Sequence, residues 1–206
     1  MNEKDYLNRL FDRLYPIMRS ITGPGLEQSL NIFKEFMPLN ITKTPSGEKV
    51  FDWVVPKEWH FKKAYLIDPD GNVICDASIN NLHVVNYSES VNKKLSLEEL
   101  GPHLYSMPEL PDAVPYVTSY YNKNWGFCIT HKKRLRLKKG LYHAIIESKF
   151  VNGGVPQAEC VIKGDSKKEI LLTSYLCHPS MANNELSGPL ALLALYNRIQ
   201  KWDKRR

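Results

Sequence analysis

Apolar side chains recur at helical spacing over the first 40 residues of the chain. From residue 7 to residue 21 they return every three or four positions, which is typical of an amphipathic helix. The sequence "TGPG" (22–25) interrupts this pattern, and a second run of the same spacing covers residues 26–37 before Pro38 ends it. The pattern therefore predicts two packed helices at the start of the protein.

Between residues 41 and 150 the pattern changes to short runs of β-branched and aromatic residues, separated by turn residues. "KAYLID" and "VICDAS" flank the turn sequence "PDGN", which predicts a β-hairpin. Two further strands are predicted on either side of "NKN" within residues 115–130, and another in "GLYHAIIES" (140–148). Ser96 is predicted to cap a short helix in "LSLEEL". Together these elements predict a compact β-rich subdomain.

A basic segment, "HKKRLRLKKG" (131–140), carries much of the formal net charge of +6. Leu135 and Leu137 alternate with arginine and lysine, which predicts a strand with one buried face and one face in water. A phosphate-binding patch is the alternative interpretation. No RNA- or DNA-binding signature accompanies the segment, so nucleic acid is not an expected partner.

After residue 154 the pattern again predicts longer elements. "AECVIKG" (158–164) and "EILLTSYL" (169–176) are predicted as two strands joined by a polar turn. The second is almost wholly apolar, which is typical of a strand buried on both faces. A helix is predicted from Ser187 onward, with Pro189 in its first turn. "CHPSMANNELSG" (177–188) therefore falls between a buried strand and a helix, where α/β sheets usually place their chemistry.

A nucleophile is one interpretation of this segment. Cys177 is next to His178, but successive side chains of an extended chain point to opposite faces, so a thiolate–imidazole pair is not expected. Ser187 lacks the flanking glycines of a nucleophile elbow. Cys177 is instead predicted to be a small buried apolar residue.

A metal site is the second interpretation. His178 follows the predicted strand directly, and Glu185 lies seven residues later at the start of the helix. An imidazole from a strand end and a carboxylate from the next loop are typical of zinc sites in α/β sheets. In a purely structural alternative, His178 makes an ordinary hydrogen bond, Asn183 or Asn184 holds the turn, and Ser187 caps the helix.

Five segments of the chain, taken in order, carry a resemblance to a known family. They are "RSITGPG" (19–25), "DWVVPKEW" (52–59), "PYVTSYY" (115–121), "WGFC" (125–128) and "CHPSMANNELSGP" (177–189). They resemble a bacterial aminopeptidase-like family, long described as domains of unknown function and often met among polysaccharide biosynthesis genes. That family is similar to the di-zinc aminopeptidases.

The resemblance implies an α/β fold class: the N-terminal part of a zinc-aminopeptidase-like α/β domain, interrupted by a β-rich subdomain. Residues 1–40 would be the helical start of the peptidase-like domain and residues 41–150 the inserted subdomain. Residues 151–206 would return to the peptidase-like domain and leave it incomplete at the C-terminus. In the family, the general base and the remaining ligands lie beyond the last residue of this chain, so no catalytic residue is assigned.

The resemblance also assigns the site residues. His178 corresponds to the first metal-binding histidine. Asn184, which follows Asn183, falls where di-zinc relatives have a bridging aspartate, and Glu185 falls one place later. A neutral amide cannot bridge two cations as a carboxylate does, so either Glu185 takes over this role or one metal is lost.

Two functions follow as hypotheses. The first is a metal-dependent aminopeptidase-like hydrolase, in which a zinc-activated water attacks a peptide or amide carbonyl of a small substrate. Zinc is then expected in the full-length protein and weakly or not at all in this chain, which should be inactive alone and prone to self-association through its incomplete sheet. The alternative is a non-catalytic binding module for a glycan or amino-sugar, which the neutral Asn184 favours.

The remaining features concern compartment and composition. The four cysteines form no CxxC pair, the N-terminus is charged throughout, and no apolar run approaches the roughly 18 residues of a membrane helix. A cytoplasmic protein without a membrane partner is therefore expected. The tryptophans Trp53, Trp59 and Trp125 are expected to pack the core of the β-rich part, with substrate contact as the alternative.

Overall fold

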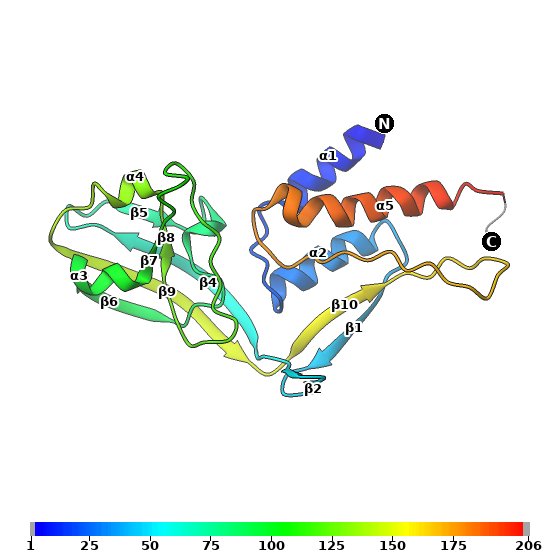
Figure 1. Cartoon of the computed structure of the whole chain (residues 1–206), viewed down its shortest axis with the longest axis horizontal. Helices are drawn as coiled ribbons and strands as arrows, with labels where there is room; N and C mark the ends of the chain where they lie inside the picture. Colours follow the sequence, from blue (N-terminus) through cyan, green and yellow to red (C-terminus); the bar gives the residue numbers. More distant parts are fainter. Residues whose placement is uncertain (1–2, 204–206) are drawn as a thin grey trace. The chain divides into compact units, whose positions relative to one another are not determined.

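The computed structural model describes residues 3–203, which fall into two compact units (Figure 1). The first unit holds the described residues up to Glu58 and from Asn152 onward, and the second unit is Trp59–Val151. The sequence prediction placed residues 41–58 with the β-rich part. They lie instead with the helices, because strand β1 (Asn40–Pro45) pairs with strand β10 (Gly154–Glu159). The chain thus mixes helices with small sheets.

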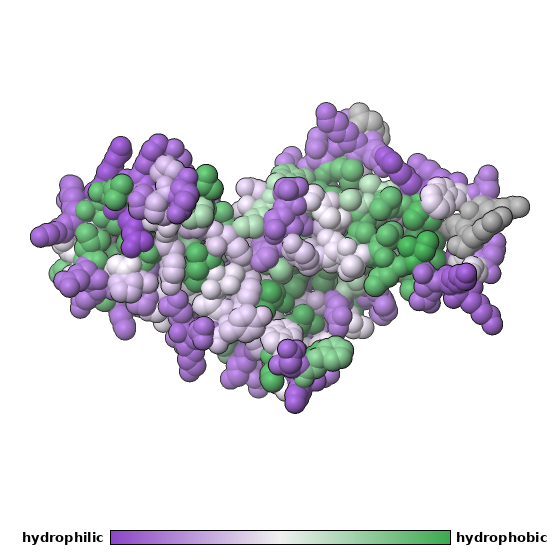
Figure 2. All heavy atoms as spheres, in the orientation of Figure 1, coloured by the Kyte–Doolittle hydropathy of each residue, from purple (hydrophilic) through white to green (hydrophobic). Residues whose placement is uncertain are grey.

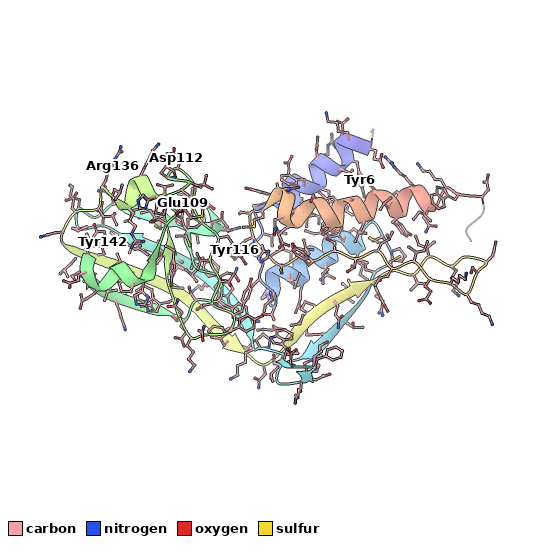
Figure 3. The ribbon with its side chains drawn as sticks, viewed as in Figure 1. Tyr6, Glu109, Asp112, Tyr116, Arg136 and Tyr142 are labelled. Carbon is pink, nitrogen blue, oxygen red and sulfur yellow. The ribbon has the colours of Figure 1, made fainter. Side chains whose placement is uncertain are left out.

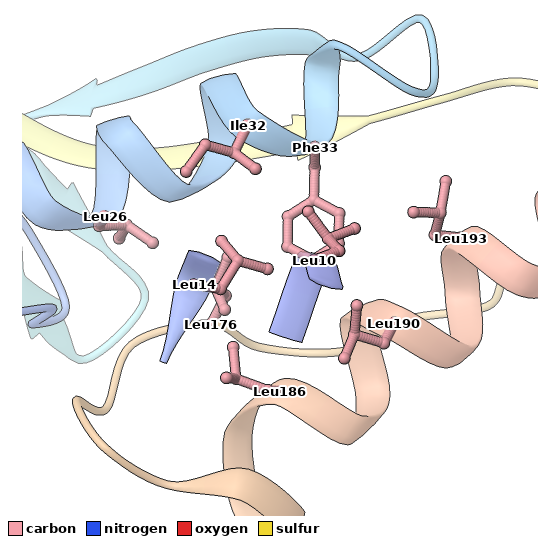
Figure 4. Packing of buried hydrophobic residues seen from close by; sticks show 9 residues of the cluster. All are labelled: Leu10, Leu14, Leu26, Ile32, Phe33, Leu176, Leu186, Leu190 and Leu193. Atoms are coloured by element: carbon pink, nitrogen blue, oxygen red, sulfur yellow. The ribbon is translucent and has the colours of Figure 1, made fainter. Parts of the chain in front are cut away.

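Three helices build the core of the first unit: α1 (Glu3–Leu14), α2 (Pro24–Lys34) and α5 (Ser187–Ile199). Their apolar faces meet in one cluster (Figure 4). The cluster consists of Leu10, Leu14, Leu26, Ile32, Phe33, Leu176, Leu186, Leu190 and Leu193. The two predicted N-terminal helices are confirmed, although each ends earlier than its apolar pattern. Of the helices that the structure describes, none has both the length and the apolar character that crossing a membrane requires.

The "TGPG" turn joins the first two helices at close quarters. Gly23 adopts φ 88°, a left-handed conformation that favours glycine, and Pro24 opens α2, where a missing N–H costs nothing. A Cβ atom on Gly25 would lie 1.9 Å from the carbonyl oxygen of Met18. Glycine is therefore required at this position. Arg19, in the segment that precedes the turn, is fully buried.

The sheet of the first unit is an antiparallel pair, in which Asn40 of β1 is opposite Glu159 of β10. A hairpin of β2 (Lys49–Val50) and β3 (Trp53–Val54) follows β1. The buried carboxylate of Glu58 accepts a hydrogen bond from the backbone N–H of Gly154 at 3.0 Å and from Lys43 Nζ at 2.7 Å. Glu58 thus ties together the two points at which the chain passes between the units.

The second unit is built on a four-stranded sheet with the order β5-β4-β9-β6. Its elements are β4 (Glu58–Ile67), β5 (Val73–Asp76), η1 (Asn81–His83), β6 (Val91–Ser96), α3 (Leu97–Leu100), η2 (Gly101–His103), β7 (Leu104–Tyr105), β8 (Phe127–Cys128), α4 (His131–Arg134) and β9 (Leu141–Val151). The predicted hairpin is confirmed as β4 and β5. The helix in "LSLEEL" is confirmed as α3, where Ser96 and Glu99 form a capping box.

The predicted strand in "HKKRLRLKKG" is wrong. Thr130 Oγ1 accepts a hydrogen bond from the N–H of Lys133 at 3.3 Å and starts the helical turn α4. Arg134 donates to the carbonyl of Leu104 at 2.6 Å, which fixes that turn on the rest of the unit. Leu135 is 73% exposed, so its alternation with arginine does not mark a buried face. Figure 3 shows Arg136 just beyond α4.

The strand predicted in residues 115–121 is also wrong. This segment makes only an isolated bridge between Thr118 and Asn86, and the N–H of Asn86 donates to the carbonyl of Val117 at 2.9 Å. Only β8 forms on the other side of "NKN", as a two-residue strand parallel to β7. The aromatic residues of this segment make ring contacts and do not pair as a strand. Tyr120, for example, packs edge-on against Tyr87.

The buried strand predicted in "EILLTSYL" is wrong as well. Residues 160–178 adopt neither helix nor strand, and Ile170 and Leu171 are each 86% exposed. Within the described part of the chain, no strand pairs with this segment, so most of its apolar side chains stay exposed. Only Leu176 reaches the helical core. Figure 2 shows hydrophobic residues, in green, at the surface on the side of the view where Figure 1 places α5.

Candidate metal centre

Three side chains with metal-binding atoms come together where the exposed apolar segment meets α5. The nitrogen of His178, the sulfur of Cys177 and a carboxylate oxygen of Glu185 all lie within 4.8 Å of one another. Of the histidines, cysteines and acidic residues among residues 3–203, these three form such a group. The structure therefore brings the two predicted ligands, His178 and Glu185, into one place and adds Cys177 to them.

The backbone of residues 179–186 sets this geometry. Ser180 adopts φ 50°, an uncommon conformation for a residue with a side chain, and turns the chain back after His178. A π-helical segment, η3 (Ala182–Leu186), follows and leads directly into α5. It leaves Asn183 and Asn184 exposed and buries Glu185 completely. Single π-helical turns are frequent at functional sites.

Glu185 is the hub of the cluster, with an exposed fraction of 0%. Its Oε2 accepts a hydrogen bond from the backbone N–H of Cys177 at 2.8 Å. Its Oε1 contacts Nδ1 of His178 directly, and the Cys177 sulfur lies 3.7 Å from the same oxygen. The His178 side chain keeps 22% of its surface exposed. The backbone of Cys177 thus fixes the buried carboxylate, while the imidazole of His178 reaches solvent.

Arg19 supports the cluster from a distant part of the sequence. Its side chain is fully buried, and its Nε donates to the backbone carbonyl of His178 at 3.1 Å. Burial lowers the pKa of Arg19 to about 10, while the negative charge of Glu185, and that of Cys177 when its thiol is ionised, act in the opposite direction. Arg19 therefore stays protonated at neutral pH and balances the buried carboxylate. Sequence reasoning missed this residue, although a charged residue in the apolar pattern before "TGPG" was the available signal.

Cys177 is half-buried, and its thiol is a poor nucleophile. Burial, and next the charge and hydrogen bond of Glu185, raise the pKa of the thiol to about 12. The side chains of Cys177 and His178 do not point to opposite faces as predicted, because the sulfur lies 3.9 Å from Nδ1 of His178. Residues 177 and 178 do not belong to a strand, so their side chains need not point to opposite faces.

The purely structural alternative for the turn is wrong in one detail. Ser187 does not cap α5, whose N-cap residue is Leu186 and lacks a side-chain cap. The hydroxyl of Ser187 instead donates to the backbone carbonyl of Asn183 at 2.5 Å. Proline at the third helical residue, Pro189, needs no N–H partner.

The donor chemistry of the cluster fits a zinc-type ion. Imidazole nitrogen, thiolate sulfur and carboxylate oxygen are the donors that zinc takes in proteins. Two modes of binding are compatible with the contact between Glu185 and Nδ1 of His178. Both residues can bind the ion directly, or Glu185 can orient the ring so that its Nε2 binds, as carboxylates often do beside metal-bound histidines.

Comparison with known proteins confirms the resemblance read from the sequence: the chain is similar to aminopeptidase-like proteins. It is 43% identical over 192 residues to a candidate polysaccharide biosynthesis protein with an aminopeptidase-like domain from Clostridium acetobutylicum. That match covers 93% of this chain and 44% of the relative.

A crystal structure of a candidate peptidase from the same species matches with a TM-score of 0.92 and 42% identity, over 96% of this chain and 47% of that one. The chain therefore spans less than half the length of either relative. Residues 58–149 match a domain of unknown function, DUF2172, whose limits nearly coincide with the second unit.

Proposed function

We propose that the chain contributes to a metal-dependent aminopeptidase-like hydrolase that acts on a peptide or amide carbonyl, and that His178 and Glu185 belong to its metal site. The observation that carries this proposal is the buried carboxylate of Glu185 held against the partly exposed imidazole of His178. The similarity to relatives described as aminopeptidase-like or as a candidate peptidase supports it.

Each of the neighbouring residues holds one part of the site in place. The N–H of Cys177 fixes one oxygen of Glu185, which leaves the other oxygen to orient the imidazole of His178. Arg19 holds the backbone of His178 and balances the negative charge. When bound, a zinc ion would supply Lewis-acid activation of water and polarisation of the carbonyl.

We further propose that this segment serves a single ion. Asn184, at the position of the bridging aspartate in di-zinc relatives, is exposed and neutral, and Glu185 is already committed to Cys177 and His178. One buried carboxylate cannot also bridge to a second cation on the side of Asn184 without giving up these contacts.

Metal analysis of the intact protein, purified without chelator, tests the proposal. We expect bound zinc or a similar metal, and hydrolysis of amino-acid anilides that a chelator abolishes. His178→Ala should lower both the metal content and the activity. His143→Ala is the matched control, because His143 lies in the second unit and contacts Asn92 at 2.7 Å. Undiminished metal content in His178→Ala would contradict the assignment of this site.

A further inference from the structure

The second unit carries a pocket that the metal centre does not explain. Its volume is about 430 Å³, within the range of small-molecule sites. The residues that line it are Glu89, Ser90, Val91, Lys93, Trp125, Ser148 and Phe150. All of them belong to the second unit, so the pocket is a site of that unit alone.

The backbone beneath this pocket is firmly held. The carbonyl of Ser88 accepts hydrogen bonds from Trp59 Nε1 at 2.9 Å and from Ser148 Oγ at 2.7 Å. The N–H of Glu89 donates to the carbonyl of Asn124 at 2.8 Å. Because Ser88 and Trp59 are buried, these bonds are shielded from water and hold the pocket in a preformed shape.

A strained residue adjoins the pocket. Tyr87 is 3% exposed and adopts φ 68°, which a bulky residue rarely does. Its ring contacts Phe150 at a centroid distance of 5.6 Å and Trp59 at 5.9 Å. The strained backbone therefore serves to place an aromatic ring behind one wall of the pocket.

Two aromatic rings form apolar walls. Trp125 stacks on His103 with 3.7 Å between ring centroids and 13° between planes, and Nδ1 of His103 lies 2.9 Å from the carbonyl oxygen of Trp125. Phe150 keeps 37% of its surface exposed while it packs on Tyr87. Each ring is thus fixed by a neighbour and still offers surface to a ligand.

The polar part of the lining has groups of both charges. Glu89 can accept hydrogen bonds, Lys93 can donate them, and Ser90 is exposed. A phosphate-rich ligand would meet the carboxylate of Glu89, and a purely apolar ligand would leave both charged groups without partners. A sugar ring suits this lining, because its C–H face packs on aromatic rings and its hydroxyls both donate and accept hydrogen bonds.

We propose that this pocket binds a hexopyranose unit of a glycan. Trp125 and Phe150 pack against the ring, and Glu89 and Lys93 hydrogen-bond its hydroxyls. The similarity to a relative described as a candidate polysaccharide biosynthesis protein agrees with this ligand class. The proposal does not depend on the metal centre, which lies in the first unit.

Nuclear magnetic resonance of the ¹⁵N-labelled chain tests the proposal directly. Maltotriose and triacetylchitotriose serve as probes, and the indole N–H signals are followed during titration. We expect the Trp125 signal to shift with at least one sugar. Trp202, which is 58% exposed and lies in the first unit, should not respond. No shift of Trp125 with either sugar at millimolar concentration, or an equal shift of both signals, would overturn the proposal.

Two lysines on one strand provide a matched pair of variants. Lys93 and Lys94 are both exposed on β6, and successive side chains of a strand point to opposite faces. Lys93→Ala should weaken sugar binding about tenfold, as expected for the loss of one charge-assisted hydrogen bond. Lys94→Ala should leave the affinity unchanged. Equal affinities for the two variants, or tighter binding of a short oligonucleotide than of either sugar, would contradict the assignment.

Discussion

Replacing Glu185 with glutamine tests the residue that contacts both other members of the candidate metal centre. The substitution keeps the volume of a side chain whose exposed fraction is 0% and removes its charge. In the wild type, one carboxylate oxygen accepts a hydrogen bond from the N–H of Cys177 at 2.8 Å, and the other contacts Nδ1 of His178. Glutamine has a single side-chain oxygen, so its NH₂ group must face one of these two partners.

If the amide oxygen stays with Cys177, the NH₂ group donates to Nδ1 of His178 and the ring proton must move to Nε2. Nδ1 then accepts a hydrogen bond and Nε2 carries the proton, so neither ring nitrogen of His178 is free to bind a metal ion. We expect metal affinity to fall about 10–100-fold, as for the loss of other groups that orient metal ligands. The loss of a charge-assisted hydrogen bond should also lower the free energy of unfolding by about 1.5–3 kcal/mol.

Two measurements on the chain check these magnitudes. Urea unfolding followed by far-UV circular dichroism reports on the first unit, because α1, α2 and α5 all belong to it. Calorimetric titration with zinc gives the affinity. Glu35→Gln is the control: its exposed carboxylate pairs with Arg13, so stability should change little and zinc affinity not at all. A Glu185→Gln chain that equals the wild type in both measurements would refute the reasoning.

Further predictions concern the core, the cysteines and the exposed segment. Leu14→Ala empties a fully buried position of the helical cluster and should cost about 2–5 kcal/mol in the same urea titration. Burial raises the pKa of Cys75, Cys128 and Cys177 from 9.0 to about 12. The stability that these buried thiols contribute is complete below their pKa in the unfolded chain and is lost as the pH rises through their pKa in the folded chain. The midpoint of urea unfolding should therefore decrease as the pH is raised between about 9 and about 12. Leu171→Asp should reduce self-association in sedimentation experiments, since Leu171 is 86% exposed. The chain alone should not hydrolyse amino-acid anilides even with added zinc, because hydrolysis also needs a general base beside the metal-bound water, and no described residue is assigned that role.

Local chemistry explains which elements could be predicted from the sequence. The N-terminal helices follow from apolar spacing, and α3 follows from Ser96 with Glu99 three residues later, because such signals act within a few residues. The segment after Thr130 was predicted wrongly. Alternation over residues 134–138 favoured a strand, but the side-chain cap of Thr130 and the contacts of α4 to distant carbonyls favoured a helical turn.

Long-range contacts explain what could not be predicted. The proximity of His178 and Glu185 could be predicted because only seven positions separate them, whereas Arg19 reaches His178 across 159 positions of the sequence. The apolar segment 169–176 was predicted as a buried strand from its composition. Its burial depends on neighbouring strands, which composition cannot supply, and in the described chain all of it except Leu176 stays exposed.

The tie that Glu58 makes to Gly154 has an evolutionary consequence. Because the chain leaves the first unit and returns to it at two points joined by one 3.0 Å hydrogen bond, the intervening segment begins and ends at nearly the same place. A genetic event that removed Trp59–Val151 would leave only a short gap to close, and the excised segment would have neighbouring termini. The DUF2172 region therefore has the arrangement of an inserted domain, whose first and last residues join the first unit at neighbouring points.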